Sequence, residues 1–118
     1  MSWGTVEEIH RRLCYVVLAH RYLYYVCQTP ILTDCDYDLL ERYLIWYEKI
    51  NNITHDKSPV NTVGSDNEWV YPKTSKEMAK HWIKNNSPAE AWFAPIDNEL
   101  KHRLLRMRVV DNRVKYAR

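Results

Sequence analysis

The sequence predicts an α+β fold: an N-terminal antiparallel helical hairpin, then a short helix and a small antiparallel β-meander. Three observations support this class. Apolar residues recur at helical spacing over residues 6–50, a proline-containing break interrupts them near residue 30, and the pattern alternates with period two near the end of the chain. A chain of 118 residues is one domain in size, so we expect residues 1–64 and an extension of residues 65–118 to pack together.

The first helix is expected to begin after Thr5, because Thr5-Val6-Glu7-Glu8 reads as a capping box. Its apolar face includes Leu13, Val16 and Leu23, and the pattern continues to Cys27. Pro30 then excludes a continuous helix, since the residue before a proline is pushed into an extended conformation.

The second helix is expected to begin after Thr33, which can cap it. Carboxylates in its first turn meet the positive end of the helix dipole. Leu40, Leu44 and Ile50 mark its buried face, and Asn51-Asn52 is a plausible stop.

The second half of the chain is expected to be mixed. Thr74-Ser75-Lys76-Glu77 reads as another capping box, opening a shorter helix. Residues 91–96 form one candidate strand. Residues 105–109 and 113–116 alternate in polarity around a two-residue turn, Asp111-Asn112, which predicts a hairpin.

Composition excludes several classes of protein. The chain has only two glycines, so the glycine-rich phosphate loops of the Rossmann and P-loop nucleotide-binding folds are absent. Three cysteines without CxxC spacing and five histidines without an HExxH motif predict neither a disulfide framework nor a metal site. No apolar run is long enough to span a bilayer, and we expect a cytoplasmic protein without membrane contact.

Aromatic and acidic residues meet where the two helices are joined, which makes this the strongest candidate for a ligand site. A tyrosine ring offers a face for a cation, and carboxylates accept hydrogen bonds from sugar hydroxyls or a carboxamide. This combination suits the positively charged ring and the sugar of nicotinamide mononucleotide. The alternative is that the carboxylates only cap a helix while the tyrosines fill the helix–helix seam. The candidate residues are Tyr24, Tyr25, Asp34, Tyr37 and Asp38.

The end of the chain is basic, and it is a candidate for contact with nucleic acid or with an acidic partner. The last eighteen residues hold seven Lys or Arg and one Asp, although the net charge of the whole chain is only +2. The alternative is a solvated sheet face that discourages edge-to-edge aggregation. The candidate contact residues are Arg106, Arg108, Arg113 and Lys115.

Three pieces of sequence, in order, resemble the N-terminal Ia segment of bacterial NAD-dependent DNA ligases over about residues 6–64. Residues 22–26 read Tyr-Leu-Tyr-Tyr-Val, residues 30–38 read Pro-Ile-Leu-Thr-Asp-Cys-Asp-Tyr-Asp, and residues 58–64 read Ser-Pro-Val-Asn-Thr-Val-Gly. The family pattern has Glu where Asp36 stands, Thr where Val60 stands and Arg where Thr62 stands. After Gly64 the resemblance ends.

The resemblance implies that the chain binds NAD or nicotinamide mononucleotide, with Tyr24, Tyr25, Asp34, Tyr37 and Asp38 at the matching positions. It also implies that the chain does not catalyse ligation, because the family's nucleophile lies in a Lys-x-Asp-Gly motif that is absent here. We therefore expect a non-catalytic accessory or sequestering protein, encoded by a phage or mobile element, or one part of a split ligase. The alternative is a scaffold that contacts a ligase, another DNA-processing protein or DNA.

Overall fold

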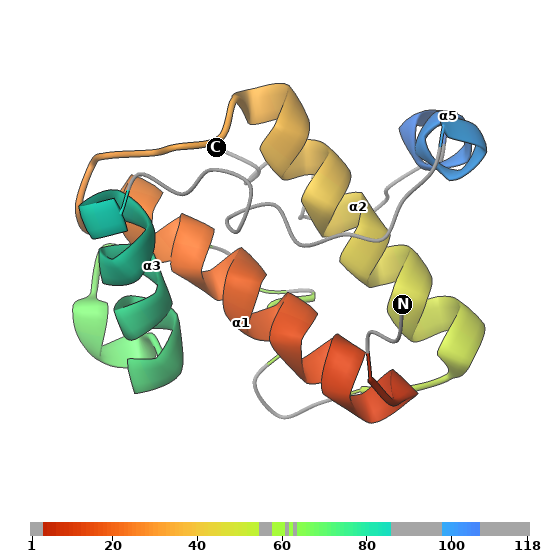
Figure 1. Cartoon of the computed structure of the whole chain (residues 1–118), viewed down its shortest axis with the longest axis horizontal. Helices are drawn as coiled ribbons and strands as arrows, with labels where there is room; N and C mark the ends of the chain where they lie inside the picture. Colours follow the sequence, from red (N-terminus) through yellow and green to blue (C-terminus); the bar gives the residue numbers. More distant parts are fainter. Residues whose placement is uncertain (1–3, 55–57, 61, 63, 86–97, 107–118) are drawn as a thin grey trace.

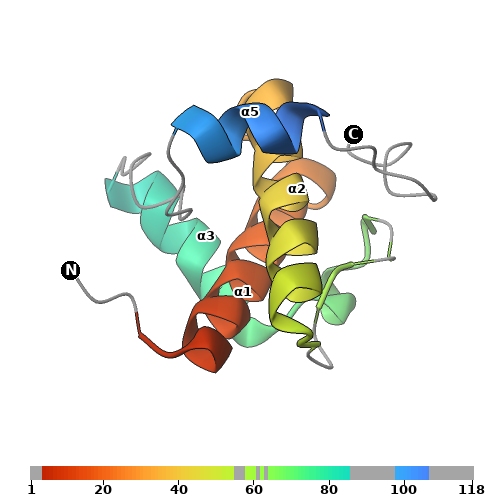
Figure 2. The ribbon, with the colours of Figure 1, turned by 90° about the vertical axis from the view of Figure 1, so that its right-hand side faces the viewer.

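The computed structural model of the chain describes residues 4–54, 58–60, 62, 64–85 and 98–106. Two long helices form a hairpin, α3 packs at an angle against the first of them, and α5 crosses the second (Figures 1 and 2). The elements in chain order are α1 (Val6–Tyr25), α2 (Asp34–Asn51), the 3₁₀ turn η1 (Glu68–Val70), α3 (Lys73–Asn85) and α5 (Asn98–Arg106).

Helix α1 begins with the expected capping box. The Glu8 N–H donates to Thr5 Oγ1 at 3.2 Å, and the Thr5 N–H donates to Glu8 Oε1 at 3.0 Å. The helix ends at Tyr25, two residues before the expected Cys27. The reason is local, because Gln28 takes a left-handed conformation (φ 54°) that turns the chain toward α2.

Helix α2 has the predicted start and stop. Thr33 Oγ1 accepts a hydrogen bond from the Asp36 N–H at 3.1 Å. At the other end Asn52 is left-handed (φ 50°, ψ 52°), and its N–H bonds to the Glu48 carbonyl. Leu40 and Leu44 are fully buried as expected, but Ile50 is 55% exposed, so the buried face stops one turn earlier than the sequence pattern indicated.

Helix α3 packs on α1 through a small buried face. Ala79 and Trp82 are buried, and the Trp82 ring stacks on His20 with ring centroids 4.8 Å apart. The helix begins at Lys73, so Thr74 lies inside it and does not cap it as predicted. Ser75 instead donates to the Tyr15 carbonyl at 2.9 Å, which ties α3 to the middle of α1.

The predicted α+β class is wrong for the part of the chain that the structure describes, which is helical and contains no strand. The expected hairpin of the meander began at Leu105, and this residue lies in α5. Leu100 and Leu104 are four residues apart and share one helix face, and Leu104 is buried in the core. Arg42 of α2 donates to the Leu104 and Leu105 carbonyls at 3.2 and 2.8 Å, which caps the end of α5. The other expected strands, at 91–96 and 107–116, lie outside the described residues.

Buried tyrosines make the fold sensitive to alkaline pH. Burial raises the pKa of Tyr43 to about 12 from its usual value of 10. Below pH 10 both the folded and the unfolded chain keep this proton, whereas above it the unfolded chain loses its proton first. We therefore expect urea unfolding to show a loss of stability between about pH 10 and pH 12, of up to about 2–3 kcal/mol from this residue. Tyr43→Phe keeps the ring but has no phenol proton to lose, so we expect it to lose less stability than the unmodified protein over the same pH range. An equal loss in both proteins would contradict the assignment to Tyr43.

Among the described helices, none combines the length and the apolar character that crossing a bilayer requires.

Candidate functional site

The end of α1 presents two tyrosines. Tyr24 and Tyr25 are half-buried, and their rings meet edge to face with centroids 4.8 Å apart and an interplanar angle of 77°. This contact fixes the two rings relative to each other, so that they form one aromatic surface.

The start of α2 presents the carboxylates. Asp34 is the first residue of the helix and is exposed, while Asp38, one turn later, is half-buried with its Oδ1 atom inside the protein. Spacing of four residues places both on one face of α2, as expected. Asp34 lies in the first turn of α2, where a negative side chain interacts favourably with the helix dipole.

Tyr37 lies deeper than the other candidates. It is only 2% exposed, and its hydroxyl donates to Glu41 Oε2 at 2.5 Å and accepts from Arg21 Nε at 2.8 Å. The same guanidinium donates to Glu41 Oε2 at 3.1 Å. Burial raises the pKa of the Tyr37 phenol well above its usual value, and the positive charge of Arg21 opposes that rise. The phenol is therefore fixed as a hydrogen-bonded neutral group between the two long helices.

Two described residues of the third ligase-like piece, Thr62 and Gly64, lie against Arg21 and Tyr25. Thr62 Oγ1 accepts a hydrogen bond from Nη1 of the Arg21 guanidinium at 2.9 Å. Gly64 lies so close to the Tyr25 ring that a methyl group at its position would sit 1.8 Å from Tyr25 Cε2. The structure thus brings all three pieces of the ligase-like sequence together, although they are separated along the chain.

The buried triad of Arg21, Tyr37 and Glu41 was missed from the sequence. Charged residues are seldom buried, so the arginine itself gives no sign of burial, yet Arg21 is 3% exposed. A signal was present, because Arg21 continues the four-residue spacing of Leu13 and Val17 and therefore lies on the buried face of α1.

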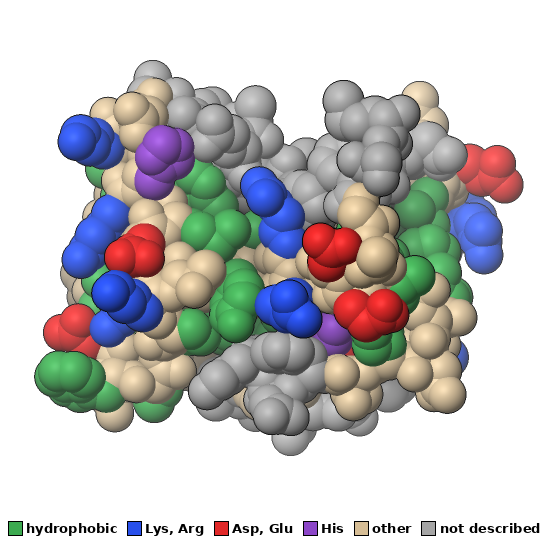
Figure 3. Space-filling model, turned by 60° about the horizontal axis from the view of Figure 1, so that its bottom comes forward, with side chains coloured by type: hydrophobic (Ala, Val, Ile, Leu, Met, Phe, Trp, Pro, Cys, Tyr) green, Lys and Arg blue, Asp and Glu red, His purple; other side chains and the backbone are tan. Residues whose placement is uncertain are grey.

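Of the candidate basic contacts only Arg106 is described, while Arg108, Arg113 and Lys115 lie outside the described residues. Arg106 is exposed and, with Trp46, Arg103 and Leu104, lines a depression of about 330 Å³. On the face drawn in Figure 3, Lys and Arg side chains alternate with Asp and Glu and do not form a surface of one sign.

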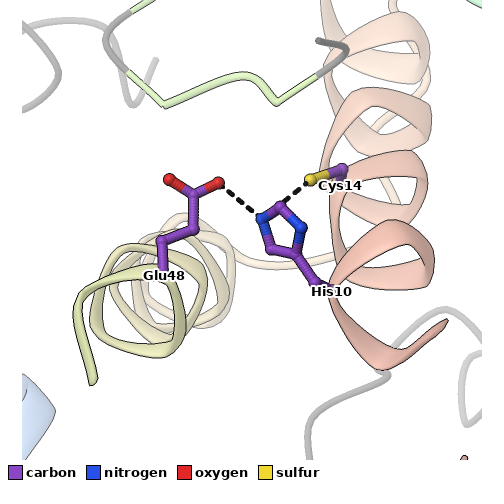
Figure 4. A group of neighbouring side chains, drawn as sticks. All are labelled: His10, Cys14 and Glu48. Carbon is purple, nitrogen blue, oxygen red and sulfur yellow. Dashed lines mark hydrogen bonds and ion pairs between the residues drawn. The ribbon is translucent and has the colours of Figure 1, made fainter. Parts of the chain in front are cut away.

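A second polar cluster lies near the other end of the hairpin, between the first half of α1 and the last turns of α2 (Figure 4). His10 Nε2 lies 2.7 Å from Glu48 Oε2 and 3.6 Å from Cys14 Sγ. Burial, and then the charge of Glu48, raise the pKa of the Cys14 thiol to about 12. Both contacts use the same imidazole nitrogen, whereas a cysteine–histidine–acid relay needs one nitrogen for each partner. The cluster therefore lacks the geometry of a nucleophilic triad.

Comparison of the sequence with known proteins finds a partial match to a DNA ligase. The chain is 39% identical over 61 residues to a DNA ligase of Geotalea daltonii. This chain carries a ligase-like segment. The match spans 51% of the chain but only 8% of that ligase, so the ligase is much the longer protein. No family model matches the chain, and no solved structure matches it.

Proposed function

We propose that this chain binds nicotinamide mononucleotide, alone or as half of NAD, without turning it over. The observation that carries the proposal is the meeting of the three ligase-like pieces at one place, with Gly64 against Tyr25 and Thr62 bonded to Arg21. The likeness to a DNA ligase supports the same assignment.

The chemistry of the proposed contacts follows from the exposure of each group. Tyr24 and Tyr25 offer half-buried ring surface to the cationic nicotinamide ring, and a cation–π contact of this kind contributes about 0.5–2 kcal/mol. Asp34 and Asp38 accept hydrogen bonds from ribose hydroxyls or from the carboxamide. Tyr37 is buried and held by Arg21 and Glu41, so its proposed role is to fix the start of α2 and not to contact the nucleotide.

The proposed role is binding and not catalysis. Transfer of an adenylyl group needs an activated lysine, and no lysine of these 118 residues is followed by x-Asp-Gly. A binding segment of this kind can serve a nucleotidyltransferase on another polypeptide, or it can sequester the nucleotide from a host enzyme.

Calorimetric titration with nicotinamide mononucleotide, NAD and AMP tests the proposal. We expect heat from the first two and none from AMP. Asp38→Asn keeps the shape of the side chain but removes its charge, and we expect it to weaken binding at least tenfold, or about 1.4 kcal/mol. Asp36→Asn is the matched control, because Asp36 is an exposed carboxylate two residues before Asp38 in the same helix. Equal losses in both variants would indicate a general charge effect and contradict a specific site.

A second candidate function rests on the depression beside α5. Trp46 supplies an aromatic surface there, and Arg103 and Arg106 supply positive charge, which together suit a nucleic-acid strand. If the titrations give no heat with any nucleotide, while DNA binds with an affinity that falls steeply as salt rises, the nucleotide proposal is wrong and the DNA-binding alternative stands.

A further inference from the structure

The cluster of His10, Cys14 and Glu48 brings three different metal-binding groups to one point. His10 is 1% exposed, Cys14 is fully buried, and the Glu48 side chain is 10% exposed. Their donor atoms all lie within 4.8 Å of one another. In Figure 4 the imidazole and the thiol project from α1 toward the carboxylate of α2.

Imidazole nitrogen, thiolate sulfur and carboxylate oxygen are the ligands that Zn²⁺ takes in proteins. With Zn–S bonds of about 2.3 Å and Zn–N bonds of about 2.0–2.1 Å, a tetrahedral ion holds the sulfur and the nitrogen about 3.5 Å apart. The observed separation of Cys14 Sγ and His10 Nε2 is 3.6 Å. His10 and Cys14 are one helical turn apart, so α1 itself fixes this spacing.

The carboxylate is also positioned for coordination. Ser58 donates a hydrogen bond to Glu48 Oε2 at 2.5 Å. Polar groups that orient metal ligands in this way are typical of metal sites. The His10–Glu48 contact of 2.7 Å is a hydrogen bond, whereas a tetrahedral Zn²⁺ holds a nitrogen and an oxygen ligand about 3.4 Å apart, so Glu48 has to withdraw by about 0.7 Å to admit an ion.

We propose that His10, Cys14 and Glu48 bind Zn²⁺, with water or the Ser58 hydroxyl as the fourth ligand. On binding, the Cys14 S–H bond breaks and its proton leaves to solvent. The His10 proton that Nε2 donates to Glu48 is exchanged through solvent for one on Nδ1, so that the Nε2 lone pair is donated to the ion. The ion joins the first half of α1 to the last turns of α2. This proposal differs from the sequence-based expectation of no metal site, because it rests on the His10–Cys14 spacing and not on a pair of histidines.

Cobalt substitution tests the proposal directly. Co²⁺ in a tetrahedral site with a thiolate ligand gives a thiolate-to-cobalt charge-transfer band and intense visible bands. Cys27 and Cys35 are exposed, so the chain offers its own controls. We expect the Cys27→Ser/Cys35→Ser variant, in which Cys14 is the only thiol, to keep both bands, and Zn²⁺ to abolish them by displacement.

Removal of single ligands completes the test. Cys14→Ala keeps two exposed thiols and is expected to lose the charge-transfer band, and Glu48→Gln is expected to weaken Zn²⁺ binding at least tenfold in competition with a chromogenic chelator. Circular dichroism checks that each variant remains helical. Loss of the bands in the Cys27→Ser/Cys35→Ser variant would overturn the proposal even if Cys14→Ala does not fold. Their persistence in folded Cys14→Ala would do the same.

Discussion

Arg21→Met is expected to lower the free energy of unfolding by about 3–5 kcal/mol, because it leaves the Glu41 carboxylate buried without its guanidinium partner. Arg21 is 3% exposed and holds three groups at once, on two segments that are far apart in the sequence. It binds Tyr37 at 2.8 Å, Glu41 at 3.1 Å and Thr62 at 2.9 Å. Urea unfolding at neutral pH measures the effect.

Two companion variants separate the ion pair from other effects of the substitution. Arg11→Met makes the same chemical change at an exposed position of the same helix and is expected to change stability by no more than about 0.5 kcal/mol. Arg21→Met combined with Glu41→Leu removes both charges and is expected to recover much of the loss. If Arg21→Met costs no more than Arg11→Met, the guanidinium does not hold the two helices and the loop together.

Gly64→Ala is expected to displace the Tyr25 ring and to weaken nicotinamide mononucleotide binding at least tenfold. The added methyl group would lie 1.8 Å from Tyr25 Cε2 and 2.3 Å from Cζ, so the ring has to move. Overpacking of this kind also costs about 1–3 kcal/mol of stability. Calorimetric titration and urea unfolding measure the two effects on the same protein.

A double-mutant cycle with Tyr25→Ala assigns the stability cost to this contact. When the ring is absent, Gly64→Ala has nothing to displace and is expected to be nearly neutral. Asp66→Ala, an exposed change two residues later, is the control for the loop. An unchanged stability in Gly64→Ala would contradict the close approach of the loop. A loss of stability with unchanged affinity would exclude Tyr25 from the nucleotide site but leave the packing intact.

The helical hairpin was predictable because its signals are local. Thr5 and Glu8 cap α1, and Thr33 caps α2, through bonds that span only three residues. α5 was not predictable by the same means. Alternating polarity after Leu105 favoured a strand, but the burial of Leu104 against the core and the bonds from Arg42 to its end belong to contacts about 60 residues apart.

The candidate nucleotide site was also predictable only in part. Its tyrosines and aspartates could be named from motifs, since each motif is a short run of chain. The burial of each residue could not be predicted from these motifs. Tyr37 is buried and bonded to Arg21 of the other long helix, whereas Asp34 is exposed.

The sequence by itself therefore determined where α1 and α2 begin, the hairpin that they form, and the likeness of this segment to a DNA ligase. Only the tertiary structure decided which polar groups are buried together. It joined Arg21 to Glu41 and Thr62, and His10 to Glu48 across 38 positions of sequence. Caps depend on the backbone of their own helix, whereas buried charges depend on which distant side chain arrives to satisfy them, and that is settled by packing.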